Sequence, residues 1–206
     1  AYILSRFPVL TETFISVEVE ELRRRGIDVQ VFSLKEPKRD KAIHGNAAEL
    51  KSTTYYYPYL LSSAILKGLF FYMRTKPATS FDIFKKIIGT HIKNPLLLLK
   101  TLAVMPKTFA IAWTLQKSGI TKVHAHWATI PTTSAWIVAK QNGITFTFTA
   151  HAWDIFKYNP MLKEKIGEAR KVITCTKFNK KFLYEKFPNI SSDKIVVIYH
   201  GMDLNK

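Results

Sequence analysis

The chain has 206 residues, enough to bury one sizeable core but too few for two comfortable domains. Hydrophobic residues make up 47% of the chain and aromatic residues 13%, which excludes a disordered or low-complexity protein. The formal net charge of +16 favours anionic partners such as nucleic acid, anionic lipid or phosphorylated small molecules, although lysine-rich faces that only keep a domain soluble would give the same charge.

The N-terminal segment predicts a β-α-β unit. Apolar residues 1–4 form the first expected strand, residues 5–11 a loop, and the alternating residues 29–34 the second strand. Between the strands we expect a helix with Thr11 as its N-cap and three arginines before Gly26 at its end. The segment has no room for a hairpin, so the strands should be parallel and the crossover right-handed.

The middle of the chain predicts an all-helical insertion, at about residues 60–118, that is rich in aromatic residues and lysines. Apolar residues recur at helical spacing over 81–92, with Lys85 and Lys86 on another face. A leucine-rich helix follows, and Pro106 should kink or end it. No uncharged stretch of the chain reaches a clean membrane span.

Before the insertion, residues 35–51 predict a loop or a short helix, and after it the β-α alternation resumes. Helices between short apolar strands predict an α/β fold with a Rossmann-like, doubly wound parallel sheet. The expected later strands are 122–126, 145–150, 171–174 and 194–199, and the expected later helices are 131–141, 161–169 and 177–187.

The compartment is predicted from the cysteine content and the first residues. The single Cys175 cannot form an internal disulfide, which fits a reducing compartment. The sequence opens in an apolar strand without Met, a basic segment or a cleavage site, so we expect no signal peptide. We therefore predict a cytoplasmic protein.

Two histidines at alternate positions of one expected strand raise the question of a metal. Ligands of such a sheet bind beyond the carboxyl ends of its strands, and His124 and His126 should point the same way there. A metal hydrolase would also need carboxylates, and Asp154 is the only nearby one. One histidine of such a pair often only bonds the backbone in the core, and we expect no metal.

His151 is the stronger catalytic candidate. It follows an uncharged strand that would fix its position, and Asp154 could orient its ring or hold a sugar hydroxyl. A satisfied structural histidine is the alternative. The sequence contains no Ser-His-Asp or Cys-His arrangement, no phosphate-binding Gly-rich loop and no nucleic-acid-binding motif, so we expect no nucleic-acid partner.

Four segments carry a resemblance to a known family. They read SRFPVLTETFI at 5–15, VHAHWA at 123–128, FTAHAWDIF at 148–156 and VVIYHGMD at 196–203. Together the first three resemble family 4 glycosyltransferases of bacterial exopolysaccharide and colanic-acid-type biosynthesis. The fourth is similar to the V-x-N-G-V-D segment where those enzymes leave their first domain and enter the hinge.

The resemblance implies that residues 1–206 are the N-terminal, acceptor-side half of a GT-B fold. The parent enzyme would transfer a sugar, with retention, from a nucleotide diphosphosugar to a glycan or lipid-linked acceptor in cell-surface polysaccharide synthesis, without a metal or other cofactor. The donor-binding domain would lie beyond the hinge, so we expect a fragment that folds but is inactive alone. A start without Met and an end in the hinge agree with that expectation.

The same resemblance assigns roles to residues after two of the later strands. His151 matches the active-site histidine that contacts the donor sugar, and Asp154 matches the D of the family's H-x-x-D-I segment. His124 and His126, with Trp127, would line the cleft. A retaining transfer needs polarised hydrogen bonds to the sugar and the leaving phosphate more than it needs a metal.

The first loop of the family faces the donor diphosphate, and many members have glycines there. This chain has Phe7, Pro8 and other bulkier residues in the loop instead. Arg6, Thr11 and the amides at the start of the helix would replace the glycine-rich contact, with Glu12 beside them in the donor cleft.

The alternative function is a non-enzymatic basic domain that docks on an anionic membrane or polymer. Residues 61–120 carry nine basic side chains against one acidic residue, Asp82. Lys85, Lys86 and Lys93 lie among apolar residues there, as in a helix at the inner face of a membrane, although they could be ordinary solvated cover. An E-x7-E-like motif downstream in the parent would distinguish a transferase from a docking domain.

Overall fold

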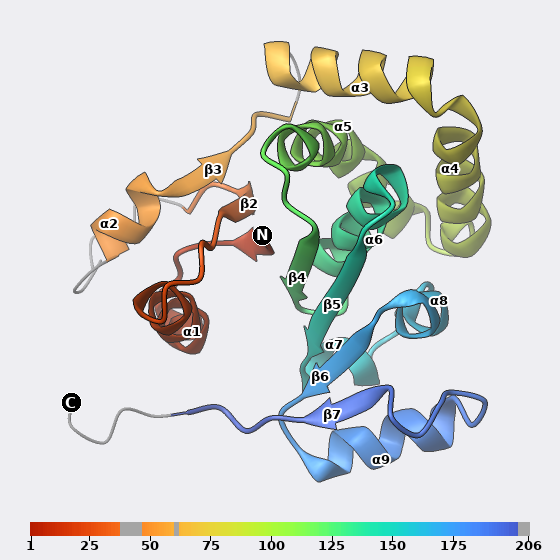
Figure 1. Cartoon of the computed structure of the whole chain (residues 1–206). Coiled ribbons are helices and arrows are strands. Elements are labelled where there is room, and N and C mark those ends of the chain that lie inside the picture. The colour runs from red at the N-terminus through yellow and green to blue at the C-terminus, as the bar shows by residue number, and fades with distance from the viewer. Residues whose placement is uncertain (38–46, 60–61, 202–206) are drawn as a thin grey trace.

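In the computed structural model, which describes residues 1–37, 47–59 and 62–201, seven strands form one parallel sheet in the order β3-β2-β1-β4-β5-β6-β7 (Figure 1). Every described strand pair is parallel, and helices provide most of the crossovers. The predicted α/β, Rossmann-like, doubly wound sheet is confirmed. The strands are β1 Tyr2–Arg6, β2 Val31–Lys35, β3 Thr54–Tyr56, β4 Lys122–His126, β5 Thr145–Ala150, β6 Lys171–Thr174 and β7 Ile195–Val197.

Apolar side chains on the two faces of the sheet pack against different helices. On β1, Tyr2 and Leu4 join a small core with α1, whereas Ile3 between them joins the larger core with α5 and α6. This alternation follows from the two-residue period of a strand. The helices are the 3-10 turn η1 Leu10–Glu12, α1 Thr13–Arg24, α2 Ala47–Ser52, α3 Ser63–Thr75, α4 Pro77–His91, α5 Pro95–Lys117, α6 Ile130–Asn142, α7 Ala152–Phe156, α8 Leu162–Glu168 and α9 Lys177–Lys186.

Helix boundaries follow the capping signals at α6 but not at the start of α1. Pro131 lies in the first turn of α6, and Gly143 ends that helix in the left-handed conformation at φ 66°, both as predicted. Thr11 is not the N-cap of α1, because η1 forms first and moves the helix start to Thr13. Glu12 occupies the N-cap position and makes no side-chain capping hydrogen bond.

Pro106 was predicted to kink or end its helix, and the helix does not end there. α5 continues through it for 23 residues. The residues on either side, Met105 and Lys107, are buried, and α5 contacts β2, α3 and α6. Packing on several sides therefore outweighs the loss of one backbone hydrogen bond.

A short strand, which was not predicted, precedes the helical insertion. Strand β3 pairs with β2 at the edge of the sheet, where the Tyr55 ring stacks on Phe32 with centroids 4.8 Å apart. A short helix, α2, precedes it within the segment predicted as a loop or short helix, whose residues 38–46 lie outside the described part of the chain. Residues 60 and 61, at the expected start of the insertion, also lie outside it.

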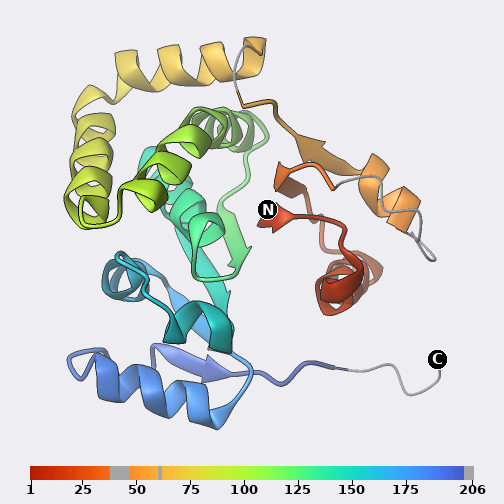
Figure 2. The same ribbon diagram turned by 180° about the vertical axis from the view of Figure 1, so that it is seen from behind.

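Helices α3, α4 and α5 make up the helical insertion, with α3 and α4 outside α5 (Figure 2). By length and composition α5 is long and apolar enough to cross a membrane, although no such span was predicted. Half of its apolar window is buried inside the protein, as in the core helix of a globular domain. The length and hydropathy of α5 are therefore weak grounds for a membrane span.

Candidate active site

The order of the strands reverses between β1 and β4, which places the candidate site at their carboxyl ends. Strand β1 ends at Arg6 and pairs with β2 on one side and β4 on the other, while β4 ends at His126. The chain moves outward in opposite directions from these two strands. Such a reversal leaves a crevice at the sheet edge where open α/β sheets bind ligands.

Four histidine rings gather at this edge, together with aromatic side chains. The His126 ring centroid lies 5.0 Å from that of His124 and 5.8 Å from that of His151. His200, beyond the end of β7, brings its ring to 5.5 Å from His151 and 4.4 Å from Phe14 of α1. The predicted histidines are therefore brought together, with His200 as an additional member.

Two threonines of β5 hold His124 in place. Its Nδ1 lies 2.8 Å from the Thr147 hydroxyl and its Nε2 lies 3.1 Å from the Thr149 hydroxyl. Burial, with His126 close by, lowers the pKa of His124 to about 3, so the ring is neutral at physiological pH. Both nitrogens are occupied, which matches the structural alternative, with threonine hydroxyls in place of the backbone.

His126 faces Glu18 of α1, a carboxylate that was not predicted to lie here. Its Nε2 lies 3.4 Å from Glu18 Oε2, an ion-pair distance without hydrogen-bond geometry, and Tyr2 Oη donates to Glu18 Oε1 at 2.5 Å. Burial opposes ionisation of Glu18, but the contacts with His126 and Tyr2 outweigh it and lower its pKa to about 2. Glu18, and not Asp154, is the carboxylate beside the His124–His126 pair.

His151 follows β5 directly, and its neutral imidazole ring is almost fully buried. Burial, together with nearby His126 and His200, lowers its pKa to about 3. Its ring lies 4.3 Å from the indole of Trp127, centroid to centroid. Its Nε2 is buried without a hydrogen-bond partner among the described residues. A buried polar atom of this kind needs a ligand or a water to satisfy it.

Asp154 holds the loops around the site and does not point into it. The side chain is 1% exposed, and its Oδ1 accepts from the His151 backbone N–H at 2.8 Å while its Oδ2 accepts from the Ala128 N–H. Asp154 therefore contacts the backbone of His151 and not its ring. Burial raises the pKa of this carboxyl to about 7, and the two amide hydrogen bonds and the buried Lys165 oppose the rise.

Trp127 and Arg6 add unsatisfied polar atoms at the same edge. Trp127 has a left-handed backbone at φ 74°, and its N–H donates to the Thr149 carbonyl at 3.0 Å. Its indole Nε1 and the Nε of Arg6 are buried without partners among residues 1–37, 47–59 and 62–201. Together with His126 and His151, they place buried polar atoms without hydrogen-bond partners among the described residues at the carboxyl edge of the sheet.

The two remaining residues predicted for the donor cleft lie on the turn before α1. Thr11 is exposed on η1, and Glu12 is half-buried. Burial raises the pKa of Glu12, and the nearby Trp127 indole, followed by His126 and Arg6, opposes that rise. Arg6 and Glu12 are therefore close enough for their charges to interact, and Thr11 is exposed next to Glu12 in the chain.

The sequence model of the family described as Glycosyltransferase Family 4 matches residues 11–206, almost the whole chain. The chain belongs to this family. No curated protein matches it closely enough to serve as a relative. As a family 4 glycosyltransferase domain, the chain belongs to a transferase that acts on a sugar donor and an acceptor.

Two side chains at this glycosyltransferase site, Cys175 and His200, were not predicted from the sequence to bind a ligand. Cys175 follows β6 directly, and His200 comes three residues after β7. Each stands alone in the sequence, so no local spacing marks it. Their positions just after β6 and β7 were the available signal, because β5, β6 and β7 are neighbours in the sheet and residues that follow them lie close together. Met202 and Asp203, at the end of the fourth family-like segment, lie outside the described residues.

Proposed function

We propose that the enzyme containing this chain transfers a sugar from a nucleotide diphosphosugar to a glycan or lipid-linked acceptor, with retention, in cell-surface polysaccharide synthesis of the exopolysaccharide or colanic-acid type. One observation carries the proposal. Buried polar atoms without partners among the described residues, on Arg6, His126, Trp127 and His151, surround the strand-order reversal of a family 4 glycosyltransferase domain.

These groups suit the chemistry of a retaining transfer. As the bond to the diphosphate breaks, negative charge develops on the leaving phosphate and positive charge on the sugar. The neutral His151 ring would donate from Nε2 to a sugar hydroxyl, and the Arg6 guanidinium would attract the diphosphate. Donors that are fixed before the reaction need no reorganisation during it, so they stabilise the transition state without a metal.

We propose that the described residues form the acceptor-side half of the catalytic cleft and that a second, donor-binding domain supplies the nucleotide contacts. Strand ends of this domain present the histidines, while the sequence contains no phosphate-binding Gly-rich loop. The catalytic cleft would then close between the two domains. We place the enzyme in the cytoplasm, peripherally at the inner face of the cell membrane.

A transfer assay tests the proposal. The enzyme containing this chain should transfer sugar from one member of a panel of radiolabelled nucleotide diphosphosugars, with retention at the anomeric carbon. The 206-residue chain alone should bind that donor weakly and show no transfer. Inverted product, or tight donor binding by the chain alone in calorimetry, would contradict the assignment of the halves.

A second function, docking on an anionic membrane, is favoured by the exposed faces of the helical insertion. On α3, Leu66, Phe70 and Met73 are 59%, 70% and 50% exposed at helical spacing. On and just after α4, Phe81 and Ile92 are 68% and 64% exposed. Exposed apolar side chains of this size rarely recur along helices that only meet water.

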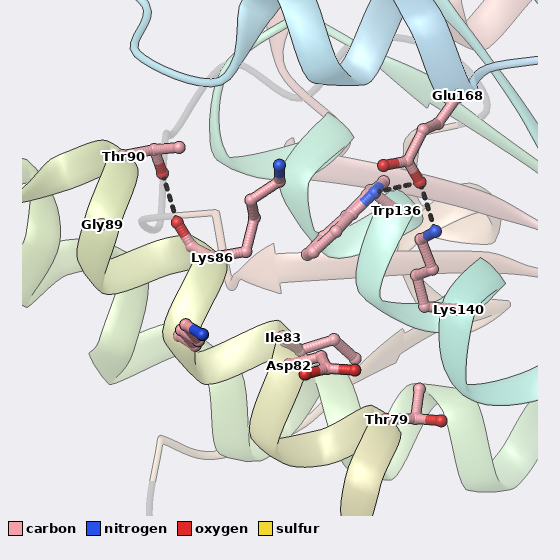
Figure 3. Close-up of a pocket in the computed structure, with 10 residues that line it drawn as sticks. Thr79, Asp82, Ile83, Lys86, Gly89, Thr90, Trp136, Lys140 and Glu168 are labelled. Carbon is pink, nitrogen blue, oxygen red and sulfur yellow. Dashed lines mark hydrogen bonds and ion pairs between the residues drawn. The ribbon is translucent and has the colours of Figure 1, made fainter.

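Basic side chains accompany these apolar stripes. Lys85 lies on the same stripe of α4 as Phe81, and all three predicted membrane-facing lysines, Lys85, Lys86 and Lys93, are exposed. Lys85 and Lys86 also border a cavity of about 640 Å³ between α4 and α6, into which Lys86 points beside the Trp136–Glu168–Lys140 group (Figure 3). We propose that anionic lipid headgroups occupy this side of the insertion.

Sedimentation with liposomes tests the docking proposal. The protein should bind vesicles that contain anionic lipid, since each basic group near such a surface contributes about 1 kcal/mol. Salt should weaken binding, because exposed charges are screened beyond about 10 Å at roughly 0.1 M. Replacing Lys85, Lys86 and Lys93 with Gln should lower the bound fraction.

A matched variant distinguishes the effect of where the lysines lie from the effect of the total charge. Replacing three exposed lysines outside the insertion, Lys122, Lys177 and Lys181, with Gln removes the same charge. Binding should then stay close to that of the unmodified protein. Equal losses in the two triple variants would show a general charge effect, and equal recovery with neutral vesicles would contradict docking through these lysines.

A further inference from the structure

The ends of β5, β6 and β7 bring three metal-ligating side chains to one point. These strands are neighbours, with Ala150 in register with Thr174 and Thr174 in register with Val197. His151 and Cys175 each follow their strand directly, and His200 comes three residues after the end of β7. Residues far apart in the sequence therefore meet at the carboxyl edge of the sheet.

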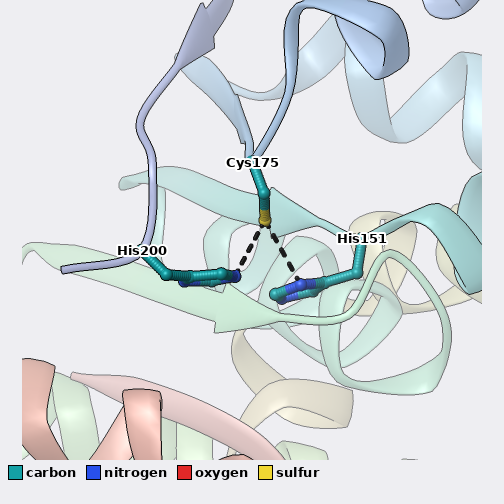
Figure 4. A group of neighbouring side chains, drawn as sticks. All are labelled: His151, Cys175 and His200. Carbon is teal, nitrogen blue, oxygen red and sulfur yellow. Dashed lines mark hydrogen bonds between the residues drawn. The ribbon is translucent and has the colours of Figure 1, made fainter. Parts of the chain in front are cut away.

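The ligand atoms of these three residues converge. Cys175 Sγ lies 3.5 Å from His151 Nδ1 and 3.0 Å from His200 Nε2, and the three atoms lie within 4.8 Å of one another. The two imidazole rings are inclined by only 11°, and the sulfur approaches both from the same side (Figure 4). One atom placed between them would contact all three.

We propose that His151 Nδ1, Cys175 Sγ and His200 Nε2 form a binding site for a soft divalent cation of the Zn²⁺ class. Zn²⁺ binds thiolate at about 2.3 Å and imidazole at about 2.0 Å with tetrahedral angles, which separates sulfur from nitrogen by about 3.5 Å. The Cys175–His151 separation already has this value, and the Cys175–His200 separation of 3.0 Å is about half an ångström shorter. A thiolate with two imidazoles favours Zn²⁺ over Mg²⁺ or Ca²⁺.

A second group of potential ligands, Glu18, His124 and His126, is less suited to a metal. Both nitrogens of His124 are already bonded to the threonines of β5, and Glu18 already accepts from Tyr2. A metal there would break these hydrogen bonds, whereas the Cys175 group gives up only weak contacts to sulfur. The difference favours the Cys175 group.

The proposed metal would connect the segment after β7 to the middle of the sheet. His200 is exposed, so the fourth coordination position is open to water. Ligation through Nδ1 also places the His151 proton on Nε2, the atom that lacks a partner among the described residues. The metal site does not depend on the proposed transfer reaction, because binding is measurable without a sugar donor.

Cobalt spectroscopy on the 206-residue chain tests the site. Cys175 is the only cysteine, so a sulfur-to-cobalt charge-transfer band can arise from no other side chain. Titration with Co²⁺ should give this band and tetrahedral visible bands, saturating near one metal per chain, and Zn²⁺ should displace them. Cys175→Ser should abolish the charge-transfer band, and His200→Gln should weaken Co²⁺ binding at least about tenfold.

Glu18→Gln is the matched control, because it removes a ligand of the second group and leaves the first intact. This variant should keep the band and the affinity, and circular dichroism should show that every variant is folded. Absence of a charge-transfer band in the unmodified chain would overturn the proposal. Loss of Co²⁺ binding in Glu18→Gln but not in Cys175→Ser would also overturn it.

Discussion

Replacing His151 with alanine should lower the rate of sugar transfer at least about 100-fold in the enzyme that contains this chain. The change removes a neutral donor whose Nε2 is buried without a partner among the described residues at the candidate site. A contact that is made mainly in the transition state lowers kcat and kcat/KM together when it is lost. Steady-state kinetics with the donor varied at saturating acceptor would measure both.

Two milder substitutions locate the effect on one ring atom. The amide nitrogen of Gln lies near the position of Nε2 in histidine, and that of Asn lies near Nδ1. If Nε2 is the donor, His151→Gln should retain more activity than His151→Asn. Thermal unfolding should stay close to that of the unmodified protein in both. Near-normal turnover of His151→Ala would remove this histidine from the catalytic site.

Strand periodicity made most of the sheet predictable, and tertiary contacts explain what it missed. β4 is observed at Lys122–His126 and β5 at Thr145–Ala150, as predicted, because apolar residues alternate with polar ones along both strands and a glycine shortly precedes each. β3 has only three residues and is stabilised by its pairing with β2 and by the stacking of Tyr55 on Phe32. Three residues are too few to show the two-residue alternation by which a strand is predicted from sequence.

Most residues of the candidate site could be predicted from the sequence, but the contacts between them could not. The position of His151 after a strand was predicted, and the structure places it beside His126. The structure also shows Asp154 bonded to two backbone amides, a contact that depends on how the loops after β4 and β5 fold together. Cys175 and His200 approach each other only because β6 and β7 are neighbours.

Replacing Gly68 with alanine should lower the free energy of unfolding by about 2 kcal/mol, although alanine is the better helix former. Gly68 is buried on α3 where that helix packs against α5. The two helices lie next to each other in Figure 1. A Cβ there would lie 2.7 Å from the Phe109 carbonyl oxygen and 2.9 Å from the Ala110 nitrogen. Backbone atoms of a buried helix cannot move aside alone, so α3 must shift away from α5.

Gly89 of α4 provides the matched control, since a Cβ at this position meets no atom within 4 Å. Gly89→Ala should raise the free energy of unfolding by roughly 0.5 kcal/mol, because alanine loses less backbone entropy in a helix. Urea unfolding of both variants measures the two changes under the same conditions. Opposite signs are expected because the two glycines differ in the space around Cβ. If Gly68→Ala were also stabilising, α3 would not pack on α5 as closely as described.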